Sequence, residues 1–580
     1  MDLDIQSLLA ESQTVVTDGV PFVQHNPLPF SQIKERRVRE GAPVAETDLY
    51  ELAHVLFDDY EDEFTFDLSR QQKQGFRDRI RKDRLNRFLA SLVWTRHGER
   101  IRHVEKLDAA TAALLHLAAK NVQAACDLLM EAKDFHLMML VAQIEQADDT
   151  FQQDIRDQLD AWREQNIISE MTEEIRALYE VLSGNTTICR GKPNAPTEDR
   201  ATTFAISEKF ELDWLQAFCL SLWYGKEKNS TIEHGVRDFV QKLESREESA
   251  SPIGEDGSED PLFVVLKLFA STGVNRDFAE PLIPQALSAL SKPWSSQSTF
   301  RFHHAIVAAV PEVHVDREKA DALATDVAFQ CSASGHVAAA VYALLHLQDA
   351  GQRAEMVQDL LRRHAAALPP PPEEDPQGEH QSIQLWNTLT LDLKVPPEWI
   401  YRAKALLARA SNDSFTELRY LILADSFAEA HECLCRRVAP RLVIDEDWET
   451  LKQVLASFGD KPEQRVGNWA AGGAIYAGFV SLVIASKHGT KERRNTLERM
   501  QKSLSERKTL FAGEGRKSGA NGLEEREERV ALSEMGRLVA ELLEMEGANK
   551  VWLTACEHRC DMTNAELAES YPGPPFNCGQ

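Results

Sequence analysis

Apolar residues recur at spacings of three and four from about residue 105 to residue 183, and this periodicity constrains the fold more than any other feature of the chain. Short polar breaks interrupt it at Lys120-Asn121, Lys133-Asp134 and residues 147–149. The segment between one break and the next has the length of one short helix plus a turn, which is typical of stacked antiparallel helix pairs. The same pattern returns at 318–365, 398–438, 447–458, 470–486 and 523–568. The sequence therefore predicts an all-α fold, an irregular helical solenoid.

Boundaries inside the solenoid are indicated by polar, Gly- and Pro-rich segments rather than by a repeat, because neither a tetratricopeptide pattern nor an ankyrin TPLH motif fits the chain. The first 45 residues differ from the rest, since glycine and proline punctuate short apolar pieces there. We expect them to form a short extended N-terminal arm. Loops are expected at Ser183–Ala201, Ser245–Pro261, Leu368–Ser382 and Phe511–Asn521.

The charge balance argues against a nucleic-acid or anionic-membrane binder, because 65 Lys and Arg oppose 92 Asp and Glu for a formal charge of -27. Nine cysteines without framework spacing indicate a reducing compartment. The N-terminus lacks signal- and transit-peptide character, so cytosol or nucleus is the expected location. Residues 466–486 carry no charge, but their many Gly and Ala residues favour a buried, closely packed helix over a membrane span.

A basic segment, Arg70–Arg102, stands out in this acidic chain, with eleven Lys or Arg and three acids. Its apolar residues follow one helix face. The favoured interpretation is a solvated helix balanced by the acidic stretch at 46–67. Contact with an acidic partner protein is the first alternative, and nucleic acid or lipid is the second, although no aromatic residues suited to base stacking are interleaved. The basic patch comprises Arg77, Arg81, Lys82, Arg84 and Arg87.

Signatures of catalysis are missing, since the chain contains no P-loop, no GxGxxG after a strand, no GxSxG elbow and no CxxC pair. His431 and Cys435 have the i, i+4 spacing of a zinc helix, but a cysteine replaces its second histidine and a packing helix is favoured. Cys556 and Cys560 lack further nearby ligands, and His303-His304 is expected at a helix start. We therefore expect no catalytic residue, cofactor or metal.

Five segments, in order over nearly 400 residues, resemble the nucleoporin-96 family, which is released from the nucleoporin 98–96 precursor and known in fungi as the nucleoporin 145 C-terminal fragment. YELAHVLFDDYED is similar to the family's entry helix, and DWLQAFCLSLWYG resembles its mid-chain motif. The segments are Tyr50–Asp62, Asp213–Gly225, Val341–Ala365, Pro396–Ala410 and Phe427–Asp445.

The resemblance implies the ancestral coatomer element fold, in which a helical trunk runs out to a crown, returns alongside itself and continues as a tail. Within that plan, Trp214, Phe218, Leu222, Trp223 and Tyr224 of the mid-chain motif are expected in the core. The expected parts are the N-terminal arm at 1–45, first trunk helices at 46–104, crown helices at 105–270, returning trunk helices at 271–440 and tail helices at 441–580.

The function implied by the resemblance is structural: a scaffold subunit of the Y-shaped coat subcomplex of the nuclear pore, at the nuclear envelope, supporting pore assembly and transport of mRNA and protein. The implied partners are a nucleoporin 84/107-type protein at the crown and 120/160-type and 85-type proteins at the tail. A Sec-thirteen propeller is a further partner where the donated β-blade is present, but residues 1–45 contain no Trp and no Gly-Trp-Gly-Pro-type string. Candidate crown contacts are Leu129, Met130, Met138 and Met139.

One alternative of the same fold is a COPII-like vesicle coat rod, although the Pro-rich tail and WD-repeat sequence expected of such a rod are missing. A metal-dependent hydrolase around His431 and Cys433 and a nucleic-acid-binding module at 70–102 are alternatives of other classes. The first predicts bound zinc, and the second predicts duplex binding with a steep salt dependence.

Overall fold

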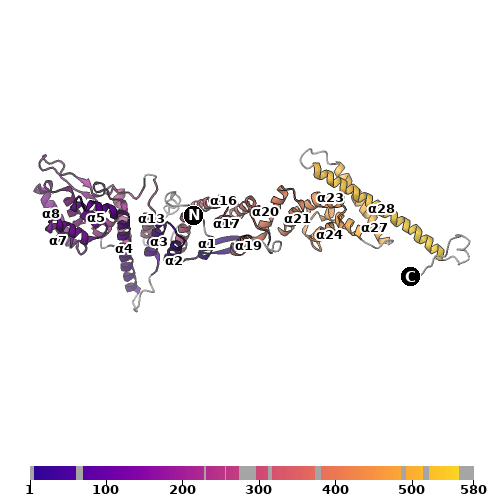
Figure 1. Cartoon of the computed structure of the whole chain (residues 1–580), viewed down its shortest axis with the longest axis horizontal. Coiled ribbons are helices and arrows are strands. Elements are labelled where there is room, and N and C mark those ends of the chain that lie inside the picture. The colour runs from indigo at the N-terminus through magenta and orange to yellow at the C-terminus, as the bar shows by residue number, and fades with distance from the viewer. Residues whose placement is uncertain are drawn as a thin grey trace. The chain divides into compact units, whose positions relative to one another are not determined.

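The structure, a computed structural model, describes residues 5–59, 70–226, 230–254, 257–272, 296–310, 317–371, 380–484, 491–513 and 522–560 (Figure 1). The chain forms two compact units, and each is described by itself. Unit 1 comprises Met1–Thr17 and Phe22–Arg353, and unit 2 comprises Asp18–Pro21 and Ala354–Gln580. Within the described ranges, no helix combines the length and the hydropathy that a bilayer crossing requires.

Helices dominate both units, as the periodicity predicts, and the strands found among the described residues form two small two-stranded sheets. The described elements up to residue 272 are α1 (Ile5–Glu11), β1 (Ser12–Thr17), β2 (Val20–His25), α2 (Phe30–Arg39), α3 (Val44–Phe57), α4 (Arg70–Val104), α5 (Ala109–Ala118), α6 (Val122–Glu131), α7 (Phe135–Val141), α8 (Asp149–Glu164), the 3-10 helix η2 (Ile167–Ser169), α9 (Glu173–Leu182), β3 (Ile188–Cys189), β4 (Phe204–Ala205), α10 (Ile206–Lys209), α11 (Trp214–Tyr224), α12 (Ile232–Glu244) and α13 (Pro261–Thr272).

The second half of the chain continues the helical stack without a further strand in its described ranges. Its elements are α15 (Ser296–Ala309), α16 (Arg317–Ala333), α17 (Val337–Leu344), α18 (Ala350–Arg363), α19 (His380–Asn387), the π-helix η4 (Thr388–Asp392), α20 (Pro397–Ala410), α21 (Ser414–Leu423), α22 (Phe427–Cys433), the π-helix η5 (Leu434–Val438), α23 (Ala439–Ile444), α24 (Trp448–Ala456), α25 (Pro462–Arg465), the 3-10 helix η6 (Trp469–Ala471), α26 (Gly473–Ile484), α27 (Lys491–Gly513) and α28 (Gly522–Cys560).

Of the described residues 5–45 of the N-terminal arm, those in the hairpin β1–β2 form strands, and α1 and α2 flank the hairpin in sequence. Pro29 precedes α2, and Phe30, Ile33 and Arg37 form its buried face at spacings of three and four. Proline is well tolerated at a helix start, where its missing N–H would be unpaired anyway. Pro29, one of the prolines that suggested an extended arm, therefore marks the start of a helix.

Unit 1 runs outward and then returns to its own beginning. Helix α3 contacts α4, which follows it in sequence, and also α13 and α15, which come more than 200 residues later. Helix α1 contacts α17, and the backbone N–H of Val23 in β2 donates to the carbonyl of Leu345 (3.1 Å). The returning helices therefore cover the apolar face that the first helices leave open.

Tight turns connect α5, α6 and α7 at the breaks predicted from the sequence. Lys120 and Lys133 adopt positive φ angles of 57° and 63°, which end one helix sharply. The next residues, Asn121 and Asp134, cap the following helices by accepting the backbone N–H groups of Ala124 and Leu137. Each pair of residues thus stops one helix and starts the next.

Unit 2 has its own core, built from α20–α24, α26, α27 and α28. The uncharged stretch 466–486 supplies η6 and α26, and Tyr476 and Phe479 are fully buried there. Gly473 lies so close to the Trp469 ring that a Cβ would meet it at 2.3 Å. Small residues in this stretch thus serve close packing, as the composition predicts.

Candidate partner interface

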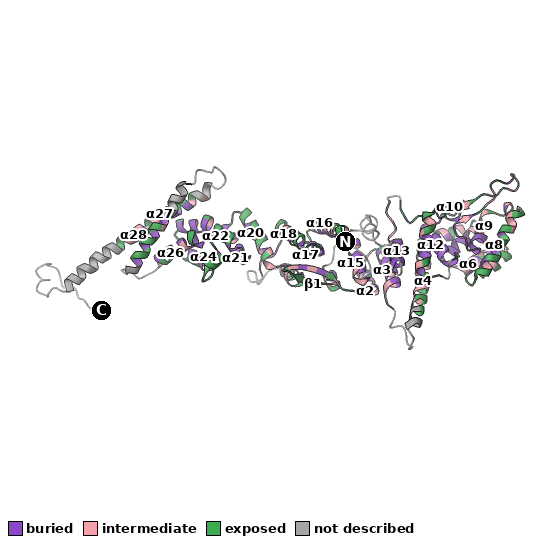
Figure 2. Ribbon diagram, turned by 180° about the vertical axis from the view of Figure 1, so that it is seen from behind, coloured by how far each residue is buried: buried purple, intermediate pink, exposed green. Residues whose placement is uncertain are grey.

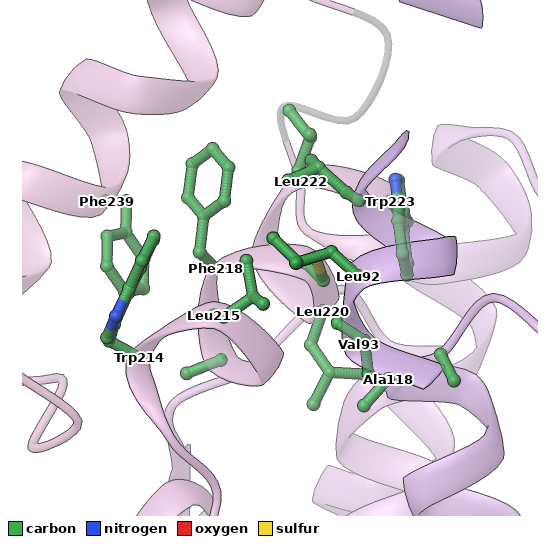
Figure 3. Packing of buried hydrophobic residues seen from close by; sticks show 14 of the residues in the cluster. Leu92, Val93, Ala118, Trp214, Leu215, Phe218, Leu220, Leu222, Trp223 and Phe239 are labelled. Atoms are coloured by element: carbon green, nitrogen blue, oxygen red, sulfur yellow. The ribbon is translucent and has the colours of Figure 1, made fainter. Parts of the chain in front are cut away.

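Helix α11 lies at the centre of the unit 1 core, where it contacts α4, α5, α9 and α12, and every one of its residues is buried. Figure 3 shows its side chains pointing between those of α4, α5 and α12. The Phe218 ring packs edge-on against Phe239 at 5.3 Å between centroids. The predicted core residues of the mid-chain motif are all buried: Trp214, Phe218, Leu222, Trp223 and Tyr224.

Polar groups fix the orientation of α11. Asp213 caps the helix by accepting the backbone N–H of Gln216 (2.8 Å), and the Gln216 side chain accepts the N–H of Asp213 in return. His97 of α4 contacts the other oxygen of Asp213 at 2.8 Å. Burial alone would raise the pKa of Asp213, but the hydrogen bonds from His97 and Gln216 outweigh it, so the pKa is lowered.

The two tryptophans at the ends of α11 also bind neighbouring elements. Trp214 donates its indole N–H to Asp260 (3.1 Å), and Trp223 donates to Asn86 of α4 (2.9 Å). Buried indole groups normally need such a partner. Helix α11 therefore holds α4 in place and supports the helices that follow α4.

Helices α6 and α7 are packed on one side and open on the other. Ala125, Leu129, Leu137 and Val141 are buried against the core, whereas the opposite side of both helices is exposed (Figure 2). Three large apolar side chains lie on the exposed side within ten residues: Met130 (48% exposed), Phe135 (57%) and Met139 (60%). We refer to these three residues as the α6–α7 face.

Two of the four predicted crown contacts belong to this face. Met130 and Met139 are exposed, but Leu129 is buried and Met138 is half-buried against the core. Of the four predicted residues, we therefore keep Met130 and Met139 as candidate crown contacts.

Phe135 completes the face, although it belongs to the apolar pattern of residues 105–183. Its apolar character fits the helical periodicity, but it stands directly after the Asp134 cap and one turn before Met139. Leu137 and Val141, which are also one turn apart, form the buried side of α7. Phe135 and Met139 are thus offset by two residues from Leu137 and Val141. This offset places the two pairs on opposite sides of α7.

The basic patch on α4 is largely engaged by the chain itself. Arg77 pairs with Asp59 (3.4 Å), Arg81 lies over the Phe269 ring (5.4 Å), and Lys82 donates to the carbonyl of Ser230 (2.9 Å). Arg84 is half-buried and Arg87 is exposed. Residues 60–67 of the predicted acidic counterpart lie outside the described residues.

The helix with zinc-like spacing serves packing. The His431 imidazole accepts the backbone N–H of Gly473 on Nε2 (2.9 Å), and the Cys435 sulfur lies 3.4 Å from the same nitrogen. Burial raises the pKa of Cys433 to about 12, so its thiol is protonated at neutral pH. The side chains of Cys556 and Cys560 lie outside the described residues. His303 and His304 lie inside α15 rather than at a helix start.

Comparison with known proteins identifies the fold's family. The model of the family described as nuclear protein 96 matches residues 111–407, more than half of the chain. The chain belongs to the nucleoporin-96 family. The matched residues include α6, α7 and α11, and hence the α6–α7 face and the mid-chain motif. As a nucleoporin, this chain is a protein of the nuclear pore complex in the nuclear envelope.

Several curated nucleoporins are similar to the chain. It is 31% identical over 383 residues to Nucleoporin NUP145 of Chaetomium thermophilum, covering 65% of this chain and 19% of that protein. It is 23% identical over 483 residues to Nucleoporin nup189 of Schizosaccharomyces pombe, covering 80% of this chain and 25% of that protein. It is 24% identical over 380 residues to Nuclear pore complex protein Nup98-Nup96 of Drosophila melanogaster, covering 63% and 18%. The alignments thus span a quarter or less of these relatives.

Proposed function

We propose that this nucleoporin is a structural scaffold subunit of the Y-shaped coat subcomplex, without a catalytic role, and that it supports pore assembly and the transport of mRNA and protein. The named relatives are pore nucleoporins, which favours this function over a vesicle coat rod. The outward and returning path of unit 1 is what a scaffold element of the implied fold requires. In this proposal, residues 105–270 act as the crown, between trunk helices at 46–104 and 271–440, and 441–580 act as the tail.

The α6–α7 face is the observation that carries the crown contact. Met130, Phe135 and Met139 expose large apolar surface on a helical pair whose other side is anchored in the core. Aromatic and methionine side chains are enriched in protein interfaces, and methionine adapts to irregular partners. We therefore assign this face to a nucleoporin 84/107-type partner.

A second surface supports the tail contacts. In unit 2, Leu455, Trp469, Val480 and Ile484 line a cavity of about 470 Å³ beside α24 and α26. This apolar concavity suits a helix side chain from a 120/160-type or 85-type protein. Binding of a Sec-thirteen propeller is proposed only for a chain that also carries the donated blade.

Sedimentation velocity tests the crown proposal. The purified chain, alone and mixed with the crown of a nucleoporin 84/107-type protein at moderate salt, should form a stable one-to-one complex. The double variant Phe135→Asp, Met139→Asp should weaken that complex by roughly 1,000-fold, since two central apolar contacts of about 2 kcal/mol each amount to about 4 kcal/mol.

Val38→Asp is the matched control, because Val38 is as exposed (55%) as the two target residues but lies on α2. It should leave the complex unchanged. No complex with the wild-type chain, or equal weakening by the control, would contradict the assignment of the α6–α7 face.

A further inference from the structure

Three histidines from distant parts of the sequence meet in unit 1. His25 ends strand β2, His304 lies in the middle of α15, and His346 follows α17. One ring nitrogen of each lies within 4.8 Å of the others. His25 and His346 are 321 residues apart in sequence, yet their Nε2 atoms are 3.1 Å apart. The hairpin, the returning helix α15 and the segment after α17 thus converge on one point.

Ring contacts hold this trio together. The His25 ring stacks on His304 with 5.0 Å between centroids, and the His304 and His346 centroids are 4.2 Å apart. Phe300 packs edge-on against both His304 and His346. Imidazoles held this closely in apolar surroundings must share protons among themselves or share a cation.

The tautomer of His346 favours a cation. Its Nδ1 lies 2.9 Å from the backbone carbonyl of Tyr342, so Nδ1 carries the proton and donates it. The lone pair on Nε2 then faces the Nε2 of His25. In metal sites, a backbone carbonyl commonly accepts the N–H of the histidine ring nitrogen that does not bind the metal.

The spacing of one pair already fits a tetrahedral ion, and the His304 ring would close on it from within 4.8 Å. Zinc–nitrogen bonds of about 2.0–2.1 Å place two ligand nitrogens about 3.3 Å apart, close to the observed His25–His346 separation. The Tyr342 hydroxyl lies 3.2 Å from the Nε2 of His25, beside the fourth position. Three imidazoles without a thiolate suit a borderline divalent ion such as Zn²⁺.

An imidazole binds a metal ion through the lone pair of its unprotonated ring nitrogen. The nearby Arg301 is paired with Glu40 (3.4 Å), which offsets its charge.

We propose that His25, His304 and His346 bind one Zn²⁺ ion that fastens the N-terminal hairpin to α15 and to the end of α17. The ion is structural, since its ligands connect segments that otherwise meet only through packing and a few hydrogen bonds. This proposal stands apart from the crown and tail contacts and involves none of their residues.

Metal uptake by the purified full chain tests the site. After chelator treatment, the chain is dialysed against ZnSO₄ at pH 7.5, and bound zinc is measured by mass spectrometry. The wild type should retain one Zn²⁺ per chain more than His304→Phe, which keeps a ring in the cluster but removes the ligand. The remaining two ligands should bind at least about tenfold more weakly.

His303→Phe is the matched control, because His303 is buried on the same helix but is not part of the trio. It should retain the ion. The unfolding temperature should rise with Zn²⁺ for the wild type and His303→Phe, but not for His304→Phe. His25→Phe provides a second ligand variant if circular dichroism shows that His304→Phe is misfolded.

Substitution by Co²⁺ separates this site from the cysteines. Binding by the trio should give visible ligand-field absorption without the thiolate-to-cobalt charge-transfer band that a cysteine ligand produces. No uptake by the wild type, equal uptake by the ligand variants, equal loss in the control, or a thiolate band for the bound ion would each overturn the proposal.

Discussion

Removing the carboxylate of Asp213 should loosen α11 and with it the centre of unit 1. Asp213→Ala loses the N-cap to Gln216, worth about 1 kcal/mol, and the charged hydrogen bond with His97, worth about 1.5–3 kcal/mol. The sum is about 2.5–4 kcal/mol. Asp213→Asn keeps an oxygen for the cap, so it should cost about 1 kcal/mol less than the alanine variant.

Hydrogen exchange of the α11 amides measures the lost stability at the helix itself. The method reports local opening, so it does not require that both units unfold together. At about 1.36 kcal/mol per factor of ten, Asp213→Ala should exchange roughly 100- to 1,000-fold faster than the wild type. Asp213→Asn should fall between the two. Exchange within threefold of the wild type for the alanine variant, or an asparagine variant as fast as alanine, would refute the assignment of these two bonds.

The same carboxylate predicts an acid dependence. The pKa of Asp213 is lowered in the folded protein from its ordinary 3.8, so the unfolded chain binds the proton more readily. The stabilisation is therefore fully present above pH 3.8 and is lost as the pH falls through the lower, folded value. The difference between wild type and Asp213→Asn should shrink only in that acidic range. A difference that shrinks already between pH 7 and pH 5 would contradict this assignment.

Three further tests address other parts of the chain. Arg37→Leu leaves the buried Glu46 without its cation and should destabilise unit 1 by about 3–5 kcal/mol, measured by thermal unfolding, and adding Glu46→Gln should restore part of the loss. Burial raises the pKa of Cys189 and Cys433 to about 12, so a short treatment with iodoacetamide at pH 8 should leave both unlabelled by mass spectrometry until the chain is unfolded. The segment Arg70–Arg102 should not bind duplex DNA at about 100 mM salt in an anisotropy titration, because Arg77, Arg81 and Lys82 contact their own chain; binding with a steep salt dependence would contradict this.

Local sequence signals predicted the parts of the fold that depend on local physics. Lys120-Asn121 and Lys133-Asp134 were readable as helix breaks because a left-handed residue followed by a capping side chain needs only its neighbours. The core position of the aromatic mid-chain motif was implied by the family resemblance, and large apolar side chains on all sides of the helix account for its burial.

Features that depend on long-range packing were not readable in the same way. Phe135 matches the apolar period equally well whether it faces the core or the solvent, and only the packing of α7 decides. Helix α2 follows a proline that also fits an extended arm. The meeting of His25, His304 and His346 depends on the return of the chain to its own start, which no local pattern records.

Because unit 1 returns to its own beginning, its first helices are synthesised well before the helices that pack on them. The hairpin and α1 pair with residues near 340–346, and the cover of α3 comes from α13 and α15, so their contacts are strongly non-local. At about 5–20 residues per second, the ribosome needs roughly 15–60 s to deliver these partners. During that interval the nascent chain lacks the partners of Tyr50 and Phe57, which pack against Phe302 and Phe269. Helix α3 of this nucleoporin therefore keeps part of its apolar surface uncovered until its own C-terminal neighbours emerge.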